Sequence, residues 1–171
     1  SPFKGPPTPE VEEAWQSAMK YGMIAVTAED ILQAGQNLTA VQFPPSVGGG
    51  YMAATVGTHQ LHCLHFIWQD HHRDSFSDVR QKITDLPELY EQHYEHCVDY
   101  IRQGVMCHFD TGIMPYNWVR DHKNPTPNSN TMHKCLDWER LQDWLRSRAV
   151  EMPEGFVWRQ PDDAVSLEWS P

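Results

Sequence analysis

HQLHCLH at residues 59–65 and HYEHCVDYIRQ at residues 93–103 share one pattern: a His, two further residues, a second His and then a Cys. In a helix, residues three and four apart lie on one face, so the imidazoles and the thiol of each segment project together. These side chains are His59, His62 and Cys63 in the first segment and His93, His96 and Cys97 in the second. One His-x-x-His is a common accident, but a second copy with the same trailing Cys, 34 positions later, is not. The repeat therefore predicts two paired helices that hold a metal site.

The helix boundaries around these segments can be predicted from capping residues. The first helix should begin near Thr58 and run into the seventies, with a solvated polar end at residues 70–74. The second should begin near Leu86, with Asp85 as its cap, Pro87 just inside and Glu88 completing a capping box. Its His93 and His96 lie on the apolar stripe, where an imidazole without a partner costs about 1–3 kcal/mol. Each His could instead bond its own backbone carbonyl, but four in matched pairs would need four separate partners.

The remaining chain predicts a mainly α, single-domain helical bundle covering residues 1–171. Helix starts are expected at Thr8-Pro9 and Thr27, and a last helix over residues 134–148 should turn several large side chains inward. Those side chains are Cys135, Trp138, Leu141, Trp144 and Leu145. Short strands at Val41–Phe43 and Tyr51–Val56 flank a Pro- and Gly-rich stretch, which predicts a small hairpin or an irregular segment. Residues 1–8 should form an extended arm and residues 152–171 a tail lying on the surface.

The charge balance disfavours two classes of partner. The chain has 13 basic and 23 acidic residues and a formal charge of -10, which repels phosphate backbones and anionic lipid. Nucleic-acid binding is therefore not expected. No apolar run approaches the roughly 20 residues needed to span a bilayer.

Four cysteines and the acceptor sequence Asn37-Leu38-Thr39 predict a disulfide-bonded glycoprotein of an oxidising compartment. Cys97 and Cys107 would lie about 15 Å apart along one helix and cannot bond each other. Two full pairings remain open: Cys63–Cys97 with Cys107–Cys135, or Cys63–Cys107 with Cys97–Cys135. A structural disulfide is preferred for Cys107 and Cys135. Cys63 and Cys97 could equally be thiolate ligands or a redox pair.

The donor types restrict the metal. Imidazole suits zinc, copper, iron and nickel, and affinity at equal geometry peaks at copper. Neither segment places a carboxylate on the same face, as a non-haem iron site would need, and the metalloprotease pattern His-Glu-x-x-His is absent. Zinc and copper remain, with copper favoured if the protein is oxidative.

HQLHCL, HCVDYIRQGVMC with the following Asp110, and His133-Lys134-Cys135 together resemble the UstYa-like proteins of fungal mycotoxin biosynthesis. The Pro-Glu-x-x-x-Ala-Trp stretch that ends at Trp15 and a Gly-Gly-Tyr before the first His segment also match, so the resemblance covers most of the chain from Pro9 to Arg148. One departure is His65, where Asn is common in the family.

The resemblance implies a copper-dependent oxidoreductase of secondary metabolism that uses dioxygen or peroxide. Its substrate would be a peptide or small-molecule metabolite, modified by cyclisation, hydroxylation, dehydrogenation or halogenation. The implied ligands are His59, His62, His93 and His96, with His133 as a further candidate; His65 and His108 are undecided. Asp99, Arg102 and Asp110 would act as supporting catalytic or salt-bridge residues.

The resemblance also implies a place in the cell and a partner. Similar proteins stand in the lumen of the secretory pathway on an N-terminal membrane anchor, which this sequence lacks, and a homo- or heterodimer with a related protein is expected. The alternative function is a non-catalytic module, stabilised by zinc and disulfides, that supports a partner oxidase.

Overall fold

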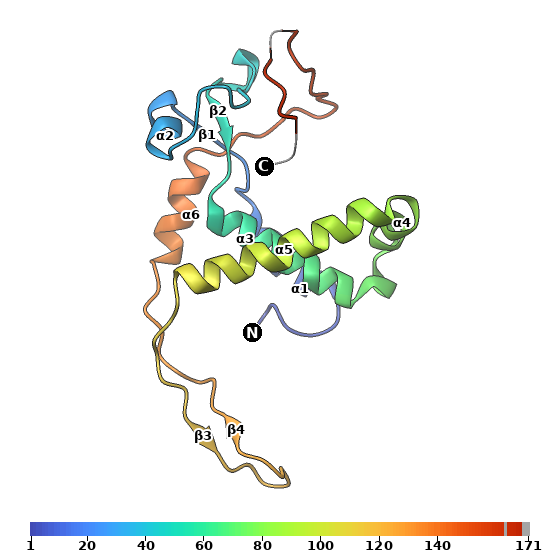
Figure 1. Cartoon of the computed structure of the whole chain (residues 1–171), viewed down its shortest axis with the longest axis vertical. Helices are drawn as coiled ribbons and strands as arrows, with labels where there is room; N and C mark the ends of the chain where they lie inside the picture. The colour runs from blue at the N-terminus through green and yellow to red at the C-terminus, as the bar shows by residue number, and fades with distance from the viewer. Residues whose placement is uncertain (163, 169–171) are drawn as a thin grey trace. The chain divides into compact units, whose positions relative to one another are not determined.

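The computed structural model describes residues 1–162 and 164–168. It is mainly helical with two small antiparallel sheets, which confirms the predicted class (Figure 1). The helices are α1 (Pro9–Met19), α2 (Ala28–Gln33), α3 (Val56–His71), α4 (Ser77–Asp85), α5 (Pro87–Cys107) and α6 (Trp138–Arg146). The strands are β1 (Ile24–Val26), β2 (Tyr51–Ala53), β3 (Tyr116–Asn117) and β4 (Thr126–Pro127), and short 3-10 turns cover Pro45–Val47 and Arg73–Ser75.

The chain forms two compact units, residues 1–61 with 140–171 and residues 62–139. The division falls inside α3, which is one continuous helix. The expectation of a single domain over the whole chain stays a prediction.

In the first unit, both predicted helix starts are confirmed. The Thr8 hydroxyl accepts a hydrogen bond from Val11 N at the start of α1, with Pro9 as the first helical residue. Thr27 and Asp30 form a reciprocal capping box at the start of α2. These bonds satisfy amide groups that the first turn of a helix leaves without partners.

Of the two alternatives predicted for residues 41–56, a small hairpin or an irregular segment, the structure has the irregular one. Tyr51–Ala53 pairs instead with β1, in the register Ile24↔Ala53 and Val26↔Tyr51, while Gln42 makes only an isolated bridge to Tyr51. Three consecutive glycines with positive φ, Gly48 to Gly50, end the intervening turn. A Cβ on Gly50 would lie 3.2 Å from Val26 O, so this turn and the approach of β1 both require glycine.

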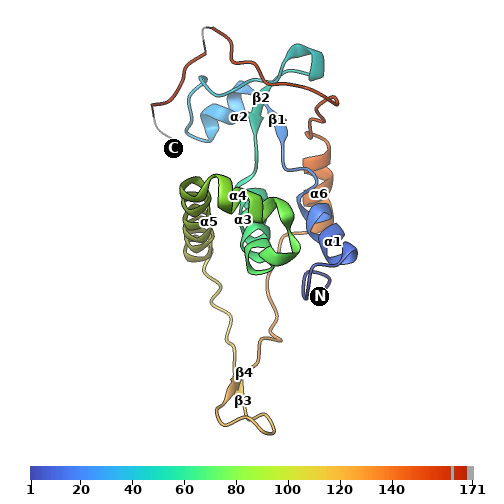
Figure 2. The same cartoon turned by 90° about the vertical axis from the view of Figure 1, so that its right-hand side faces the viewer.

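The last helix is shorter than predicted. It begins at Trp138, and of the five side chains expected to face inward only Leu145 is buried. After α6, Ala25 N of β1 donates a hydrogen bond to Arg148 O at 2.9 Å. Within α6, the side-chain amide of Gln142 donates to Ala18 O of α1, and α6 lies beside α1 in Figure 2. Farther along, Trp158 packs on Phe43 with ring centroids 6.0 Å apart. The predicted surface tail includes residues 163 and 169–171, which lie outside the described residues.

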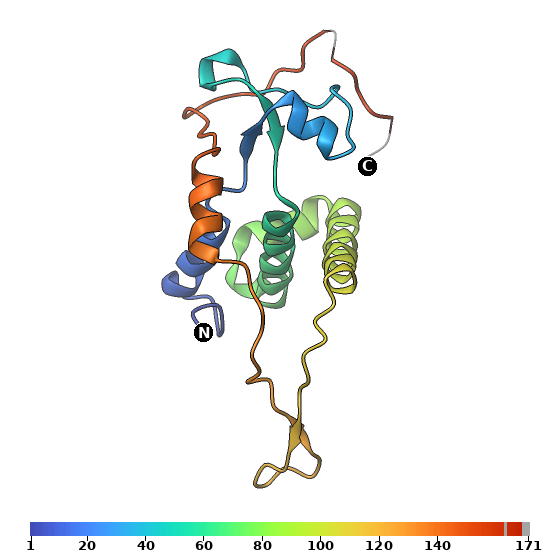
Figure 3. The same ribbon diagram turned by 90° about the vertical axis from the view of Figure 1, so that its left-hand side faces the viewer.

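The second unit is built on α3 and α5, which lie side by side in Figure 3. The sequence did not predict α4, and its last residue is Asp85. The predicted Asp85 cap of α5 is therefore wrong, since a residue already inside one helix is not free to cap the next. Leu86 takes that position without a side-chain bond, and Pro87 opens α5 as predicted.

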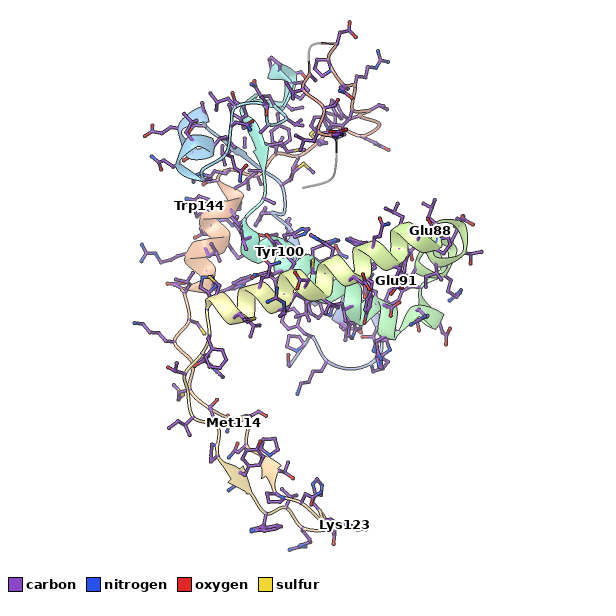
Figure 4. The ribbon with its side chains drawn as sticks, in the orientation of Figure 1. Glu88, Glu91, Tyr100, Met114, Lys123 and Trp144 are labelled. Carbon is purple, nitrogen blue, oxygen red and sulfur yellow. The ribbon has the colours of Figure 1, made fainter. Side chains whose placement is uncertain are left out.

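Residues 108–137, which follow α5, form an extended segment. From here on, the arm means this segment and not residues 1–8. Its strands β3 and β4 pair antiparallel, with Tyr116 opposite Pro127 and Asn117 opposite Thr126. In Figure 4 the labelled Met114 and Lys123 lie on this arm, well beyond the end of α5. Apart from the half-buried Thr126 and Thr131, every arm residue is exposed.

All four cysteines are free thiols, so the prediction of a disulfide-bonded domain is not supported. Cys63 and Cys97 are buried between helices, whereas Cys107 and Cys135 are exposed. Among the described residues, no helix has the length and apolar character to cross a membrane.

Candidate metal centre

The contacts between α3 and α5 show that the two helices run antiparallel. Phe66 packs on His93 and Tyr90, with ring centroids 4.4 and 5.2 Å away, and Asp70, one turn later, accepts a hydrogen bond from the Tyr90 hydroxyl at 2.9 Å. Thus positions later in α3 meet positions earlier in α5. Residues near each N-terminus stabilise the start of the helix. At α3 the Thr55 hydroxyl accepts a hydrogen bond from Thr58 N, and at α5 Pro87 is the first helical residue.

This pairing brings His59, Cys63 and His96 together. One ligand atom from each lies within 4.8 Å of the other two. His59 and Cys63 are one turn apart on α3, and His96 comes from α5. The thiol is fully buried, His59 is half-buried and His96 is exposed, so the group opens to solvent on the His96 side.

The repeat in the sequence gives the site an approximate two-fold relation. An offset of 34 residues relates His59 to His93, His62 to His96 and Cys63 to Cys97. Applied to the group above, it generates His93, Cys97 and His62. These residues are also neighbours: His93 Nε2 lies 3.7 Å from Cys97 Sγ, and the His62 and His93 rings are 5.7 Å apart. The two helices therefore present two similar sets of two imidazoles and one thiol. Among the described residues, only the first set has all three ligand atoms within 4.8 Å of one another.

The local environment favours the neutral forms of His62 and Cys97. Desolvation, followed by the charges of His65 and Lys82, lowers the pKa of His62, which favours the imidazole form that binds metals. Burial, and then the hydrogen bond and charge of the neighbouring Cys63, raise the pKa of Cys97. A bound cation would reverse that effect, since metal ions bind the thiolate.

The His59, Cys63 and His96 group fits a copper or zinc ion. Ligand atoms about 2.0–2.3 Å from one ion lie at most about 4.6 Å from each other. The three atoms lie within 4.8 Å of one another, near that range. Copper and zinc both bind imidazole and thiolate ligands. No carboxylate belongs to this group among the described residues, as expected from the sequence. Three protein ligands would leave a coordination position open.

The other predicted site residues lie elsewhere. His133 Nδ1 is 2.6 Å from Asp110 Oδ2, and its Nε2 is 3.3 Å from the Thr131 hydroxyl, so both ring nitrogens have partners within the arm. The hydrogen bond between His133 and Asp110, followed by the one from Gly112 N, lowers the pKa of Asp110. His108 lies just after the end of α5, with Nδ1 3.4 Å from Gly104 O. Buried His65 stacks on Trp68.

Asp99 and Arg102 form an exposed ion pair one turn apart on α5, with Arg102 Nε 2.7 Å from Asp99 Oδ1. Bonds from Arg102 and then Gln103 lower the pKa of Asp99. The assignment of His133, Asp99 and Arg102 to the site stays a prediction.

Sequence reasoning missed two supports of the centre. Asp70 was expected in a solvated helix end, yet it is buried and bonded to Tyr90 and Arg73. Tyr90 on the apolar stripe was the available signal, since a buried hydroxyl needs a partner. The second support is Tyr100, whose ring stacks on His96 at 5.5 Å one turn later on α5.

Comparison with known proteins adds family information. The family model described as "Mycotoxin biosynthesis protein UstYa" matches residues 1–148. The chain is 30% identical over 157 residues to the UstYa family oxidase phomYc of Diaporthe leptostromiformis, covering 88% of this chain and 60% of that protein. It is 27% identical over 177 residues to the UstYa family oxidase aprY of Aspergillus flavus, covering 91% and 52%.

A third relative is the chlorinase cctP2 of Talaromyces islandicus, which is 32% identical over 98 residues, covering 55% of this chain and 27% of that protein. The chain thus spans about half of the length of the two oxidases and less of the chlorinase. No solved structure is significantly similar to it.

Proposed function

Since the chain belongs to the UstYa family of mycotoxin biosynthesis proteins, we propose that it is a copper-dependent oxidase that tailors a peptide or small-molecule metabolite. The observation that carries this proposal is the convergence of His59, Cys63 and His96 from two helices. The relatives named oxidases and the relative named a chlorinase support oxidative chemistry on a metabolite.

In this proposal His59, Cys63 and His96 hold one copper ion, and the related set His62, His93 and Cys97 holds a second. Copper supplies a redox centre that reacts with dioxygen or peroxide. The protein supplies the donors, keeps the thiols away from bulk water and leaves the exposed His96 side open to substrate. Phe66 and Tyr100 hold the rings of His93 and His96 by packing on them.

Secretory localisation remains part of the proposal. Asn37 and Thr39 of the acceptor sequence are both exposed, so the asparagine is accessible for glycosylation. Mass spectrometry of protein secreted by a eukaryotic host should find a glycan that is absent from an Asn37→Gln variant. An unmodified Asn37 in that material would contradict this part of the proposal.

A disulfide between Cys107 and Cys135 remains part of the proposal, although both residues are free thiols in the structure. Asn128 N bonds Pro115 O, and Asp110 bonds His133, so the pairing seen at β3 and β4 continues toward α5. The same register carried back from Asp110 places Cys107 opposite Leu136, the residue next to Cys135. Oxidation would transfer two protons and two electrons from the thiols to a disulfide such as oxidised glutathione, which becomes two thiols.

Peptide mapping after equilibration with oxidised glutathione tests this pairing. The expected product links Cys107 to Cys135 and disappears in Cys107→Ser. Recovery of both residues as free thiols, or of a Cys63–Cys107 bond, would rule it out.

Dioxygen uptake by the copper(I)-loaded protein tests the oxidase proposal. The wild type should consume dioxygen, whereas His59→Ala and His96→Ala should lose most of the uptake while keeping the helical circular dichroism spectrum. His108→Ala is the matched control, because it removes an exposed imidazole of the same unit outside the cluster. Tightly held zinc and no uptake by the wild type would instead favour the non-catalytic zinc module.

A further inference from the structure

Tyr90 and Asp70 form a largely buried pair of a phenol and a carboxylate between α5 and α3. The Tyr90 hydroxyl donates to Asp70 Oδ1 at 2.9 Å, and Asp70 is only 9% exposed. The other carboxylate oxygen, Oδ2, accepts from Arg73 Nη2 at 3.0 Å, and Arg73 Nε bonds the Asp70 carbonyl oxygen. These bonds fix the carboxylate with one oxygen aimed at the phenol.

Packing alone does not require a carboxylate at this place. Tyr90 packs against the apolar cluster of Cys63, Phe66 and Cys97, where apolar side chains of similar volume would often be as stable as a buried charge. A titratable side chain that is desolvated and has a specific charged partner is instead typical of functional sites. The Tyr90 and Asp70 pair therefore calls for a chemical role.

The Tyr90 phenol is protonated in the resting protein and has a base ready to accept its proton. Burial, followed by the hydrogen bond to Asp70 and the charge of that residue, raises the pKa of Tyr90. Loss of one electron reverses this preference, because an oxidised phenol is a strong acid. A base must lie within about 2.6–3.2 Å to take such a proton, and Asp70 Oδ1 meets that condition.

The Tyr90 ring also reaches the proposed metal ligands through packed rings. The Phe66 ring centroid lies 5.2 Å from that of Tyr90 and 4.4 Å from that of His93. Tyr90 precedes His93 by three residues on α5, so both side chains lie on the same face of that helix. An electron can cross such short distances between rings, whereas a proton needs a hydrogen bond. Tyr90 thus has one route for an electron, toward His93, and another for its proton, toward Asp70.

We propose that Tyr90 is a redox-active tyrosine that gives one electron to the centre at His93 while its proton moves to Asp70. This role rests on the proposed copper oxidase function. Reduction of one hydrogen peroxide to two waters breaks the O–O bond and takes two electrons and two protons. Copper(I) gives one electron, Tyr90 gives the other, and solvent gives both protons. The Tyr90 O–H bond breaks in the same step, which leaves a neutral phenoxyl radical and a protonated Asp70.

Flash oxidation of the metal-free full chain by photogenerated tris(bipyridine)ruthenium(III) tests the pair without copper. Electron paramagnetic resonance of the wild type should show a tyrosyl radical, and Tyr90→Phe should lose most of that signal. Asp70→Asn keeps an oxygen that can accept the phenol hydrogen bond but removes the base, so it should slow radical formation roughly 100-fold. A hydrogen bond with a purely structural role would leave this rate unchanged.

Tyr94→Phe is the matched control for these measurements. Tyr94 lies one turn after Tyr90 on α5 and packs on the same Phe66 ring, with centroids 6.3 Å apart. Among the described residues, no carboxylate is bonded to its hydroxyl. This variant should form the radical like the wild type, and the circular dichroism spectra of all the variants should agree.

The copper-loaded protein treated with hydrogen peroxide tests the link to the centre. The wild type should form the same radical, whereas His93→Ala should lose it with peroxide and still form it under flash oxidation of the metal-free chain. Loss under both conditions would place the effect of His93 on Tyr90 itself and overturn the electron route.

A flash-generated radical that survives Tyr90→Phe, or that forms equally fast in Asp70→Asn, would overturn the proposal. So would a copper-loaded wild type that consumes dioxygen yet forms no radical at Tyr90 with peroxide, and in that case the oxidase function would stand. Normal flash oxidation of Tyr90 together with no dioxygen uptake would support the Tyr90 and Asp70 pair and overturn the oxidase function instead.

Discussion

Cys63 and Cys97 are the two most deeply buried side chains among the described residues, and they meet where α3 and α5 cross. Their small volume allows the two backbones to approach closely, and the larger imidazoles occupy the adjacent positions on the same faces. Phe66 then closes one side of the pair by packing on His93, Tyr90 and Tyr94. The positions of the imidazoles therefore depend on a few core residues that are not themselves ligands.

Tyr100 tests this dependence, because its ring stacks on His96. Tyr100→Ala should weaken copper binding about tenfold, a loss typical for residues that orient a ligand. Tyr100→Phe retains the ring and should bind copper like the wild type. A competition titration with a copper chelator measures both, and equal affinity of the Ala variant would show that Tyr100 does not position His96.

Phe66 should be the most sensitive apolar position of the helix pair. Phe66→Ala removes its contacts with three aromatic or imidazole rings and should lower the free energy of unfolding by about 3–5 kcal/mol. Leu89→Ala on the exposed side of α5 should change it by no more than about 0.5 kcal/mol. Guanidinium denaturation measures the free energy of unfolding of both variants. Similar decreases in Phe66→Ala and Leu89→Ala would mean that the core does not lie between α3 and α5.

At the scale of elements, the sequence predicts what is local. Thr8 and Thr27 begin helices because a hydroxyl, the next few amides and a nearby acid are enough to form a cap. The repeated His-x-x-His-Cys pattern likewise predicts two helical faces. The pairing of β2 with Ile24–Val26 could not be predicted in this way, since it joins segments separated by a helix and a glycine turn. The helix α4 was not predicted either. Because Asp85 is its last residue, Asp85 does not cap the next helix.

The capping box of α2 predicts a pH effect. Bonds from the Thr27 amide and hydroxyl lower the pKa of Asp30 below 3.8, so the carboxylate stabilises the folded state above the unfolded pKa and loses that effect as the pH falls through the folded value. Asp30→Asn should therefore show a shallower loss of stability on acidification than the wild type. Denaturation midpoints measured at decreasing pH test this.

Glu29→Gln is the control for that measurement, since it leaves both Thr27 bonds in place. An Asp30→Asn variant with the same acid dependence as the wild type would contradict the assigned cause.

At the scale of the whole molecule, the sequence identified the ligand types but not their grouping. It brought four imidazoles and two thiols to one place without deciding between one ion and two. The antiparallel pairing joins His59 with Cys63 and His96, and separately brings His62 near His93. Helical periodicity gives the face of each helix, but which residues meet across the pair depends on the direction and register of the second helix.

Copper should stabilise the chain through the helix pair. A ligand that binds only the folded state adds about 2.7 kcal/mol at a free concentration 100 times its dissociation constant, which raises the thermal midpoint. His96→Ala should reduce this rise, because it removes a ligand of one of the two proposed ions, whereas His108→Ala should keep the full rise. Differential scanning calorimetry with and without copper measures the shift, and an equal rise in His96→Ala would place the stabilising ion elsewhere.

The most direct test is the metal content of the protein purified without added metal and analysed by element-resolved mass spectrometry. The convergence of α3 and α5 on a copper site predicts bound copper in the wild type and in His71→Ala, an exposed imidazole of α3 outside the cluster. It predicts that His59→Ala and His96→Ala each lose the ion of the first set and keep at most the ion held by His62, His93 and Cys97, with the fold retained. A copper content equal to that of the wild type in both variants, or a wild type that holds only zinc, would contradict it.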